Sequence, residues 1–283
     1  MPTSSTTAGA SAGSRDTRSS EVLLELDGLE LSFGGVTALA GVDVLARRGE
    51  LLAIIGPNGA GKSSLFNCIN GVYQPQKGQV RFAGEDITGL QPHERASRGI
   101  ARTFQNLALF DELSVLDNLM AARSHLMRRG AISGLLWWGP TAREELAHRE
   151  AVEGVIDFLD LEDARHSRVA QLPYGWRKRV EIGRALCMEP QLLLLDEPVA
   201  GMNQEETEDV ARYLLDLKES RPHLTQILVE HNLGVVMDIA DRVMVLDFGR
   251  IIADGQPEEV AQDPQVMAAY VGEQRSQQGG SVA

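Results

Sequence analysis

The segment GPNGAGKSS at residues 56–64 carries the strongest chemical signal of this 283-residue chain. It matches the pattern G-x-x-x-x-G-K-[ST], in which glycines let the backbone curl around phosphate groups and the following helix presents its positive N-terminus to them. In such a loop Lys62 reaches the β- and γ-phosphates, and the Ser63 hydroxyl binds Mg²⁺. The apolar run LLAII before it and the helix-like KSSLFNCIN after it make a purely structural glycine turn the weaker interpretation. The sequence predicts a nucleoside triphosphate site formed by Gly56, Pro57, Asn58, Gly59, Ala60, Gly61, Lys62, Ser63 and Ser64.

Three further side chains with suitable chemistry follow short apolar runs. Asp196 and Glu197 end the segment LLLLDEP, and His231 follows QILVE. Because ligands bind at the carboxyl ends of strands in an open α/β sheet, all three are expected at one edge. Asp196 is predicted to join the Mg²⁺ shell and Glu197 to orient an attacking water. His231 is predicted to contact the γ-phosphate. The alternatives are that the acidic pair only caps a helix and that the histidine lies on the surface.

Short apolar segments separated by helical patterns must position these residues. Residues 22–26 and 42–55 are predicted strands, and the run LLAII in the second is typical of a strand covered on both faces. Further strands are predicted at 79–82, 192–195, 226–229 and 243–246. Two amphipathic helices are predicted, with stripes at Val210, Tyr213, Leu214 and Leu217 and at Leu233, Val236, Met237 and Ala240. This alternation predicts an α/β fold with a mostly parallel sheet between helices, interrupted by a helical insert at about 106–170.

Composition restricts the class of protein. The formal net charge of −13 argues against a nucleic-acid partner, because phosphate backbones require basic surface. The longest apolar runs are far shorter than the ~20 residues of a membrane-spanning helix, and no secretory signal opens the chain. The two cysteines, Cys68 and Cys187, are expected to be buried free thiols in a reducing compartment. A cytoplasmic protein is expected, with a flexible Ser/Thr/Ala/Gly-rich tail at 1–20.

The motifs also follow the order found in ABC ATPases, and the chain resembles that family over nearly all of residues 22–255. The matching positions are Phe33, 56–63, Gln105, 172–176, Asp196–Glu197 and His231. No N-K-x-D motif of a guanine-reading switch occurs. The resemblance implies a P-loop cassette with an N-terminal antiparallel β subdomain, in which Phe33 stacks on adenine and Gln105 belongs to the ATP and Mg²⁺ site. It also implies that Lys62, Glu197 and His231 carry the hydrolysis of ATP.

A closer resemblance is to the larger cytoplasmic ATPase of branched-chain amino acid importers of the LIV type. It rests on LPYGWRKRVEIGRAL, DEPVAGMN, VEHNLGVVMDIADRVMVLDFGRIIADG and the ending GQPEEV…DP…AAYVG. It implies one nucleotide-binding domain at 21–272, with a family extension at about 255–272 and a flexible tail at 273–283. It further implies a peripheral location on the cytoplasmic face of the membrane.

The partners implied are a second ABC ATPase subunit, two membrane permease subunits and an extracytoplasmic solute-binding protein. Homodimer and heterodimer remain open. Other cargoes, such as urea, amides or exported lipids, are alternatives. A soluble non-transport ABC ATPase and a nucleotide-binding regulator without turnover are rival classes.

The segment QLPYGWRKRV departs from the general ABC signature. By the resemblance Pro173, Tyr174, Gly175 and Trp176 contact the ATP of the partner subunit, in trans. Pro173 has neither a hydroxyl nor an N–H, so the N–H of Gly175, its neighbours and the helix dipole must supply the contact. Trp176 replaces the usual glutamine and either stacks or packs. Asn203 stands where most ABC ATPases have an aspartate, which is expected to weaken contacts across the dimer.

Two segments have two interpretations each. Arg177, Lys178 and Arg179 either form a solvated helix face, which we favour, or steer the nucleotide. The apolar residues in ISGLLWWGP at 132–140 either complete the core of the helical insert or present a patch to a permease or the membrane surface.

Overall fold

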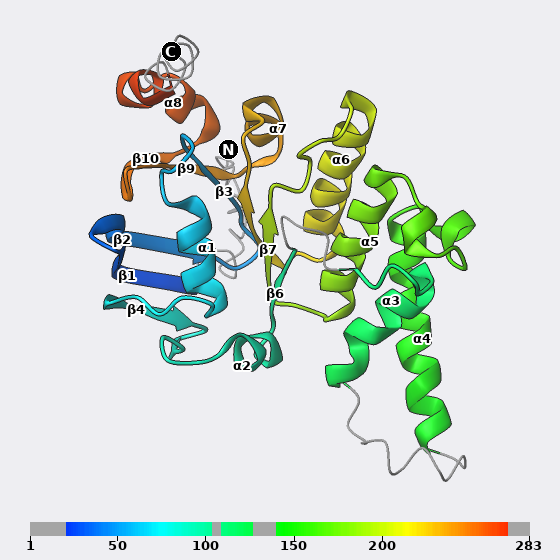
Figure 1. Ribbon diagram of the computed structural model, residues 1–283. Coiled ribbons are helices and arrows are strands. Elements are labelled where there is room, and N and C mark those ends of the chain that lie inside the picture. The colour runs from blue at the N-terminus through cyan, green and yellow to red at the C-terminus, as the bar shows by residue number, and fades with distance from the viewer. Residues whose placement is uncertain (1–20, 104–108, 127–139, 271–283) are drawn as a thin grey trace, which may run out of the picture.

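The computed structural model describes residues 21–103, 109–126 and 140–270. The predicted tails at 1–20 and 273–283 lie outside the described residues, as do Gln105 and the pair Trp137–Trp138. Two β-sheets and a group of helices make up the described part (Figure 1).

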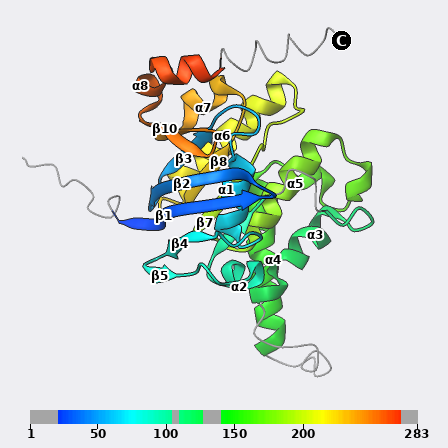
Figure 2. The ribbon, with the colours of Figure 1, turned by 60° about the vertical axis from the view of Figure 1, so that its left-hand side comes forward.

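The first sheet is antiparallel, with strand order β2-β1-β4-β5. Its strands are β1 (Val22–Phe33), β2 (Val36–Arg47), β4 (Lys77–Phe82) and β5 (Glu85–Asp86). Figure 2 shows β1 and β2 in front of helix α1 (Lys62–Asn70). The expected N-terminal antiparallel subdomain is therefore confirmed, as is the strand predicted at 79–82.

The prediction of one strand over 42–55 is wrong. Residues 42–47 end β2, and β3 (Leu51–Ile55) begins a different sheet. The chain turns at Gly49, whose φ of 73° is in the left-handed region. A Cβ at Gly49 would lie 2.3 Å from the Pro222 carbonyl oxygen, so glycine is required both for the turn and for the close approach.

The second sheet is mostly parallel, with strand order β10-β9-β3-β8-β7-β6. Its remaining strands are β6 (Ile100–Arg102), β7 (Leu192–Asp196), β8 (Thr225–Val229), β9 (Arg242–Asp247) and β10 (Arg250–Gly255). Only β10 is antiparallel to its neighbour, and the other four pairings are parallel. The mostly parallel core sheet is therefore confirmed.

Successive residues of β3 enter two different cores, because side chains alternate along a strand. Leu52 and Ile54 pack with α1 and the antiparallel sheet. Leu51, Ala53 and Ile55 pack with helices on the opposite face, including α5 (Tyr174–Cys187) and α6 (Gln204–Ser220). All five strand residues are buried, as expected for a strand covered on both faces.

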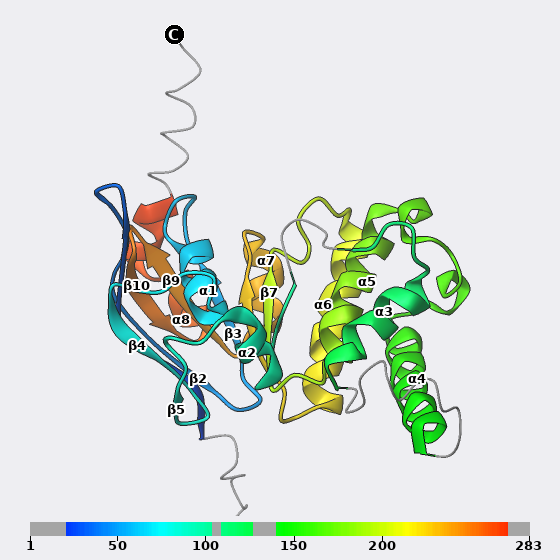
Figure 3. The same ribbon diagram turned by 60° about the horizontal axis from the view of Figure 1, so that its bottom comes forward.

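The helices at the far side of the sheet include the expected helical insert (Figure 3). They are α3 (Val115–Ala122), α4 (Pro140–Phe158) and short 3-10 turns at Arg123–Leu126, Glu162–Ala164 and Val169–Gln171. They pack on α5, where a Cβ at Gly183 would lie 3.0 Å from Leu119 and 3.1 Å from Leu159. The exact domain bounds stay a prediction. Among the described helices, none is long and apolar enough to cross a bilayer.

The two predicted amphipathic stripes have different outcomes. All four apolar residues of the stripe on α6 are buried, as predicted. On α7 (Leu233–Ile239) the prediction is partly wrong, because Leu233 is exposed and the buried residues are Val236 and Ile239. Met237 and Ala240 are partly buried against the same core, so only Leu233 departs from the predicted face. The remaining helices are α2 (Pro92–Ser97) and α8 (Pro257–Ala261), and residues 264–270 are also helical.

Candidate functional site

The loop at 56–61 joins the end of β3 to the start of α1. Its three glycines, Gly56, Gly59 and Gly61, have φ values of 149°, 79° and 109°. A Cβ at Gly56 would lie 2.0 Å from the Leu246 carbonyl oxygen, and one at Gly61 would lie 2.4 Å from that of Ala38. The curl of the loop therefore depends on glycine at both of its ends.

The first turn of α1 faces this loop. Gly61 is the N-cap residue, so no cap side chain occupies the N–H groups of Lys62, Ser63 and Ser64. The Lys62 ammonium donates to the carbonyl oxygens of Gly56 (2.6 Å) and Pro57 (2.9 Å), which places its charge inside the loop. Backbone N–H groups, a helix N-terminus and an ammonium thus converge as a phosphate group requires.

The parallel pairing of β3, β8, β7 and β6 puts their carboxyl ends at one edge of the sheet. The phosphate loop follows β3, His231 follows β8, and Asp196 is the last residue of β7. The structure thus brings together the residues that the sequence predicted at this edge.

Asp196 is 3% exposed and forms an ion pair with Arg102 at 2.7 Å. The other terminal nitrogen of Arg102 donates to the Asn67 side-chain oxygen at 2.7 Å, and the guanidinium lies 5.7 Å from the centre of the Phe66 ring. Sequence reasoning missed Arg102, although it lies close to the predicted site residue Gln105 in the sequence, because its partner is 94 residues away.

The donor set fits Mg²⁺. The Asp196 carboxylate and the exposed Ser63 hydroxyl are hard oxygen donors, which Mg²⁺ prefers. The described residues contain no group of three or more His, Cys, Asp or Glu side chains that could hold a metal by themselves. Such a site relies on phosphate oxygens and water for its other ligands, as is usual for Mg²⁺ bound with a nucleotide.

Glu197 and His231 meet just beyond the carboxyl ends of the neighbouring strands β7 and β8. The His231 Nε2 atom lies 2.7 Å from Glu197 Oε1. Glu197 has a φ of 48°, which costs a non-glycine residue about 1–2 kcal/mol. Its N–H donates to the Val229 carbonyl oxygen at 2.9 Å, which helps to hold this conformation. Backbone strain at such a residue is typical of functional sites.

Glu230 is a second residue that sequence reasoning missed. It lies between β8 and His231 and is 2% exposed. Burial raises the pKa of Glu230, whereas hydrogen bonds from the N–H groups of Val199, His231 and Asn232 lower it. The nearby Glu197 carboxylate also raises this pKa.

The signature segment begins α5. Pro173 is the N-cap residue, and Tyr174 is 43% exposed. Gly175 is buried, and a Cβ there would lie 2.2 Å from the Glu206 carboxylate oxygen Oε1. Helices α1 and α5 lie on opposite sides of β7 in both Figure 1 and Figure 3.

The cations that follow are paired, and a solvated face does not describe them. Arg177 forms an ion pair with Asp111 (2.8 Å), and Arg179 with Asp209 (2.6 Å). Lys178 is 2% exposed and pairs with buried Glu181 at 3.4 Å. Local sequence could not reveal the two arginine pairs, because Asp111 and Asp209 come from distant segments, whereas Glu181 is only three residues from Lys178.

Trp176 packs and does not point to solvent. It is partly buried against the core of the helical side. The Arg179 guanidinium lies 5.7 Å from the centre of the Trp176 ring and 5.4 Å from that of Tyr213. These contacts favour packing for Trp176, with the Arg179 guanidinium near both rings, and its contact with a nucleotide stays a prediction.

Asn203 is the N-cap residue of α6. Its side chain accepts a hydrogen bond from the Glu206 N–H (2.9 Å), and the Glu206 carboxylate accepts one from the Asn203 N–H (3.1 Å). This capping box is a role that asparagine and aspartate fill about equally well.

Phe33 ends β1 and is 47% exposed. Its ring lies 5.1 Å from that of Tyr73 at an interplanar angle of 66°. Contact of Phe33 with adenine stays a prediction.

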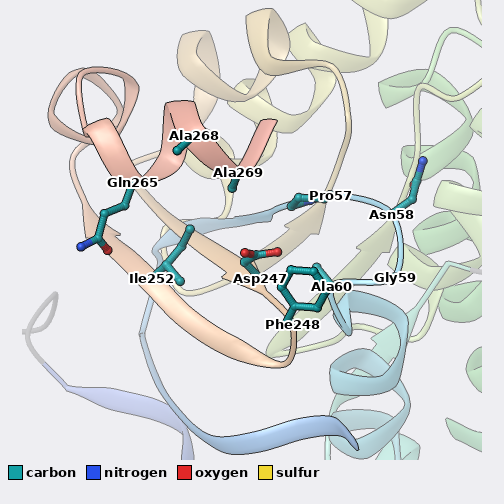
Figure 4. Close-up of a pocket in the computed structure, with 10 residues that line it drawn as sticks. All are labelled: Pro57, Asn58, Gly59, Ala60, Asp247, Phe248, Ile252, Gln265, Ala268 and Ala269. Atoms are coloured by element: carbon teal, nitrogen blue, oxygen red, sulfur yellow. The ribbon is translucent and has the colours of Figure 1, made fainter. Parts of the chain in front are cut away.

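A cavity of about 670 Å³ lies beside the phosphate loop. Pro57, Asn58, Gly59 and Ala60 form one wall, and Ile252, Gln265, Ala268 and Ala269 form the other (Figure 4). The Asp247 carboxylate and the exposed Phe248 ring lie between these walls. The C-terminal elements are therefore in a position to contact the phosphate loop.

Comparison with known proteins gives two family matches. The family described as ABC transporter matches residues 39–200. The family described as branched-chain amino acid ATP-binding cassette transporter matches residues 250–275, which include one wall of the cavity.

Curated relatives match over most of their length. The high-affinity branched-chain amino acid transport ATP-binding protein BraF of Pseudomonas aeruginosa is 38% identical over 90% of this chain and 99% of its own. The corresponding protein LivG of Escherichia coli K12 is 36% identical over the same shares.

Solved structures match the fold. An ATP-binding cassette of an ABC transporter in its ADP conformation has a TM-score of 0.77 and 34% identity, covering 89% of this chain and 99% of that one. A nucleotide-free cassette from an ABC transporter has a TM-score of 0.75 and 33% identity, covering 88% and 98%.

Proposed function

Because this chain belongs to the ABC transporter family, as an ATPase cassette, we propose that it hydrolyses ATP at the site around Lys62 to power uptake of branched-chain amino acids. The observation that carries this proposal is the common edge of β3, β7 and β8. There the phosphate loop, Asp196 and the Glu197–His231 pair lie together. The names of the relatives BraF and LivG favour this cargo.

The phosphate loop binds the triphosphate. The N–H groups at 56–64 cradle the β- and γ-phosphates, and the Lys62 ammonium exchanges its contacts with Gly56 and Pro57 for phosphate oxygens. Ser63, Asp196 and Gln105 would hold Mg²⁺, which supplies positive charge to the phosphate oxygens. The Phe33 ring stacks on the adenine.

Glu197, which has a strained backbone, and its contact partner His231 take part in hydrolysis. Glu197 orients a water whose oxygen attacks the γ-phosphorus while the bond to the β–γ bridging oxygen breaks. His231 keeps Glu197 in place and donates to the γ-phosphate as charge develops there.

The signature segment acts on a second nucleotide. The position of α5 and α1 on opposite sides of β7 supports a contact of Tyr174 and Gly175 with the ATP of a partner ATPase subunit, in trans. Pro173 offers no N–H, so the backbone of the first turn of α5 makes the contact. Closure of two cassettes buries both nucleotides.

Membership of the ABC transporter family supports a proposal for the assembly. Two permease subunits dock on the helical side, and an extracytoplasmic binding protein delivers the solute. The chain then lies at the cytoplasmic face of the membrane. The proposed nucleotide-binding domain spans residues 21–272. It includes a helical part at about 106–170 and a C-terminal extension at about 255–272.

The test of hydrolysis is the substitution Glu197→Gln. We expect ATP binding within about threefold of wild type and a loss of turnover of roughly 10²–10⁴-fold. Glu219→Gln, on an exposed part of α6, is the control and should hydrolyse ATP normally. Equal turnover in Glu197→Gln and wild type would remove the role given to Glu197.

The test of cargo is uptake in cells that carry the permease and binding-protein genes. Labelled leucine, isoleucine and valine should enter with wild type and not with Glu197→Gln. Uptake of urea or an amide instead, or lipid export, would keep the ATPase and replace the cargo. Failure to co-purify with any membrane protein would favour a soluble ABC ATPase.

A further inference from the structure

The Glu230 carboxylate accepts hydrogen bonds from two separate backbone segments of the site. Its Oε1 atom accepts a hydrogen bond from the Val199 N–H at 3.0 Å. Its Oε2 atom accepts from the His231 N–H at 3.0 Å and from the Asn232 N–H at 3.4 Å. One carboxylate oxygen therefore accepts from the segment after β7, and the other accepts from the segment after β8.

A carboxylate is the group that suits this place. Three N–H donors point to it, and an ionised carboxylate has only acceptors to offer. A glutamine of the same shape would replace one oxygen by an NH₂ group, which would then face an N–H donor. The side chain is buried, so water cannot repair the lost hydrogen bond.

The two anchored segments are those that carry Glu197 and His231. Val199 is two residues after Glu197, and the Ala200 N–H donates to the Glu197 carbonyl oxygen (3.2 Å) to close that turn. His231 directly follows Glu230. The backbone positions of both side chains, and hence their 2.7 Å contact, therefore depend on the same carboxylate.

We propose that Glu230 is a positioning residue for ATP hydrolysis, which acts by holding His231 against Glu197. The proposal rests on the proposed function, because it assumes the roles given there to these two residues. The opposing view is that Glu230 only completes backbone hydrogen bonds and stabilises the fold. The two views differ in whether substitution of Glu230 lowers kcat only when His231 is present.

The first test compares Glu230→Gln in two backgrounds of the full chain. In the wild-type background kcat should fall roughly 10- to 100-fold, while the Kd for ATP stays within about threefold. In the His231→Ala background the same substitution should lower kcat by less than about twofold, because no contact remains to be positioned. An equal factor in both backgrounds would overturn the proposal, as would an unchanged kcat.

The second test does not need turnover. In the chain labelled with ¹⁵N-histidine, the His231 ring signals are assigned by their loss in His231→Gln. Glu197→Ala and Glu230→Gln should move these signals in the same direction, because both remove the contact. Unmoved His231 signals in Glu230→Gln would contradict the proposal.

Glu50→Gln is the matched control. Glu50 is a partly buried carboxylate whose side chain is 9% exposed, and it pairs with Arg242 (2.7 Å) at the opposite end of β3. This variant should lose stability with normal kcat and unmoved His231 signals. If Glu230→Gln does not fold, Glu230→Asp takes its place, since it keeps the charge but is too short to reach both segments. Absence of hydrolysis in wild type itself would refute the proposed function and, with it, a role of Glu230 in hydrolysis. Normal hydrolysis with unmoved His231 signals in Glu230→Gln would refute this inference alone.

Discussion

Arg102 holds Asp196 in a buried ion pair, with a guanidinium nitrogen 2.7 Å from the Asp196 oxygen Oδ2 and both side chains less than a tenth exposed. The pair joins β6 to the end of β7 at the edge where the nucleotide is expected. A carboxylate predicted to bind Mg²⁺ is thus compensated by a cation of the chain itself.

This pair gives the first prediction. Arg102→Ala should lower the free energy of unfolding by about 3–5 kcal/mol, because it leaves a buried carboxylate without its cation. Asp196→Asn in the same chain should recover part of that loss by removing the charge. Urea unfolding of the two single variants and the double variant measures both effects. Additive losses would show that the ion pair does not couple the two residues.

The second prediction concerns the glycines of the phosphate loop. Gly59→Ala should cost about 1–2 kcal/mol, because alanine is strained at a φ of 79° but meets nothing within 4 Å. Gly61→Ala has the same strain and also places its Cβ 2.4 Å from the Ala38 carbonyl oxygen. It should therefore be less stable than Gly59→Ala and bind ATP more weakly. Denaturant unfolding and nucleotide titration of the pair check this order.

The third prediction is a pH dependence. Burial raises the pKa of Cys68 from 9.0 to about 11, and that of Cys187 to about 12. At a pH between about 9 and the raised pKa, each thiol keeps its proton in the folded chain but has lost it in the unfolded chain. The free energy of unfolding must therefore fall as the pH rises above about 9. Each thiol contributes a slope of at most about 1.4 kcal/mol per pH unit. Unfolding at pH 8 to 11 should show a shallower fall for Cys68→Ala than for wild type. Parallel curves would mean that the Cys68 thiol titrates normally.

The fourth prediction separates packing from nucleotide contact at Trp176. Trp176→Gln restores the residue usual in the ABC signature. It should lower stability by about 1–3 kcal/mol, because it removes buried ring surface and the contact with Arg179. ATP hydrolysis per folded molecule should stay close to that of wild type. Lost hydrolysis with unchanged stability would assign Trp176 to the nucleotide instead.

Features that depend on neighbours in the sequence were predicted well. The glycine-rich loop between a strand and a helix, the strands predicted at 192–195 and 226–229, and the buried face of α6 each follow from local pattern. The errors arose where tertiary contact decides. The strand predicted over 42–55 is divided at Gly49, where the Pro222 carbonyl oxygen leaves no space for a Cβ. The cations after Trp176 looked solvated because their acidic partners, such as Asp111 and Asp209, are far away in the chain.

The sequence by itself determined which groups could bind a triphosphate, because the glycines, Lys62 and Ser63 act through spacing within one loop. It also determined the edge of the sheet to which Asp196, Glu197 and His231 belong, since a parallel strand order follows from alternating strands and helices. Only the tertiary structure decided how these groups are held. Arg102 on Asp196 and Glu230 beneath His231 are contacts between separate strands, and hydrogen-bond geometry across that separation leaves no local pattern in the chain.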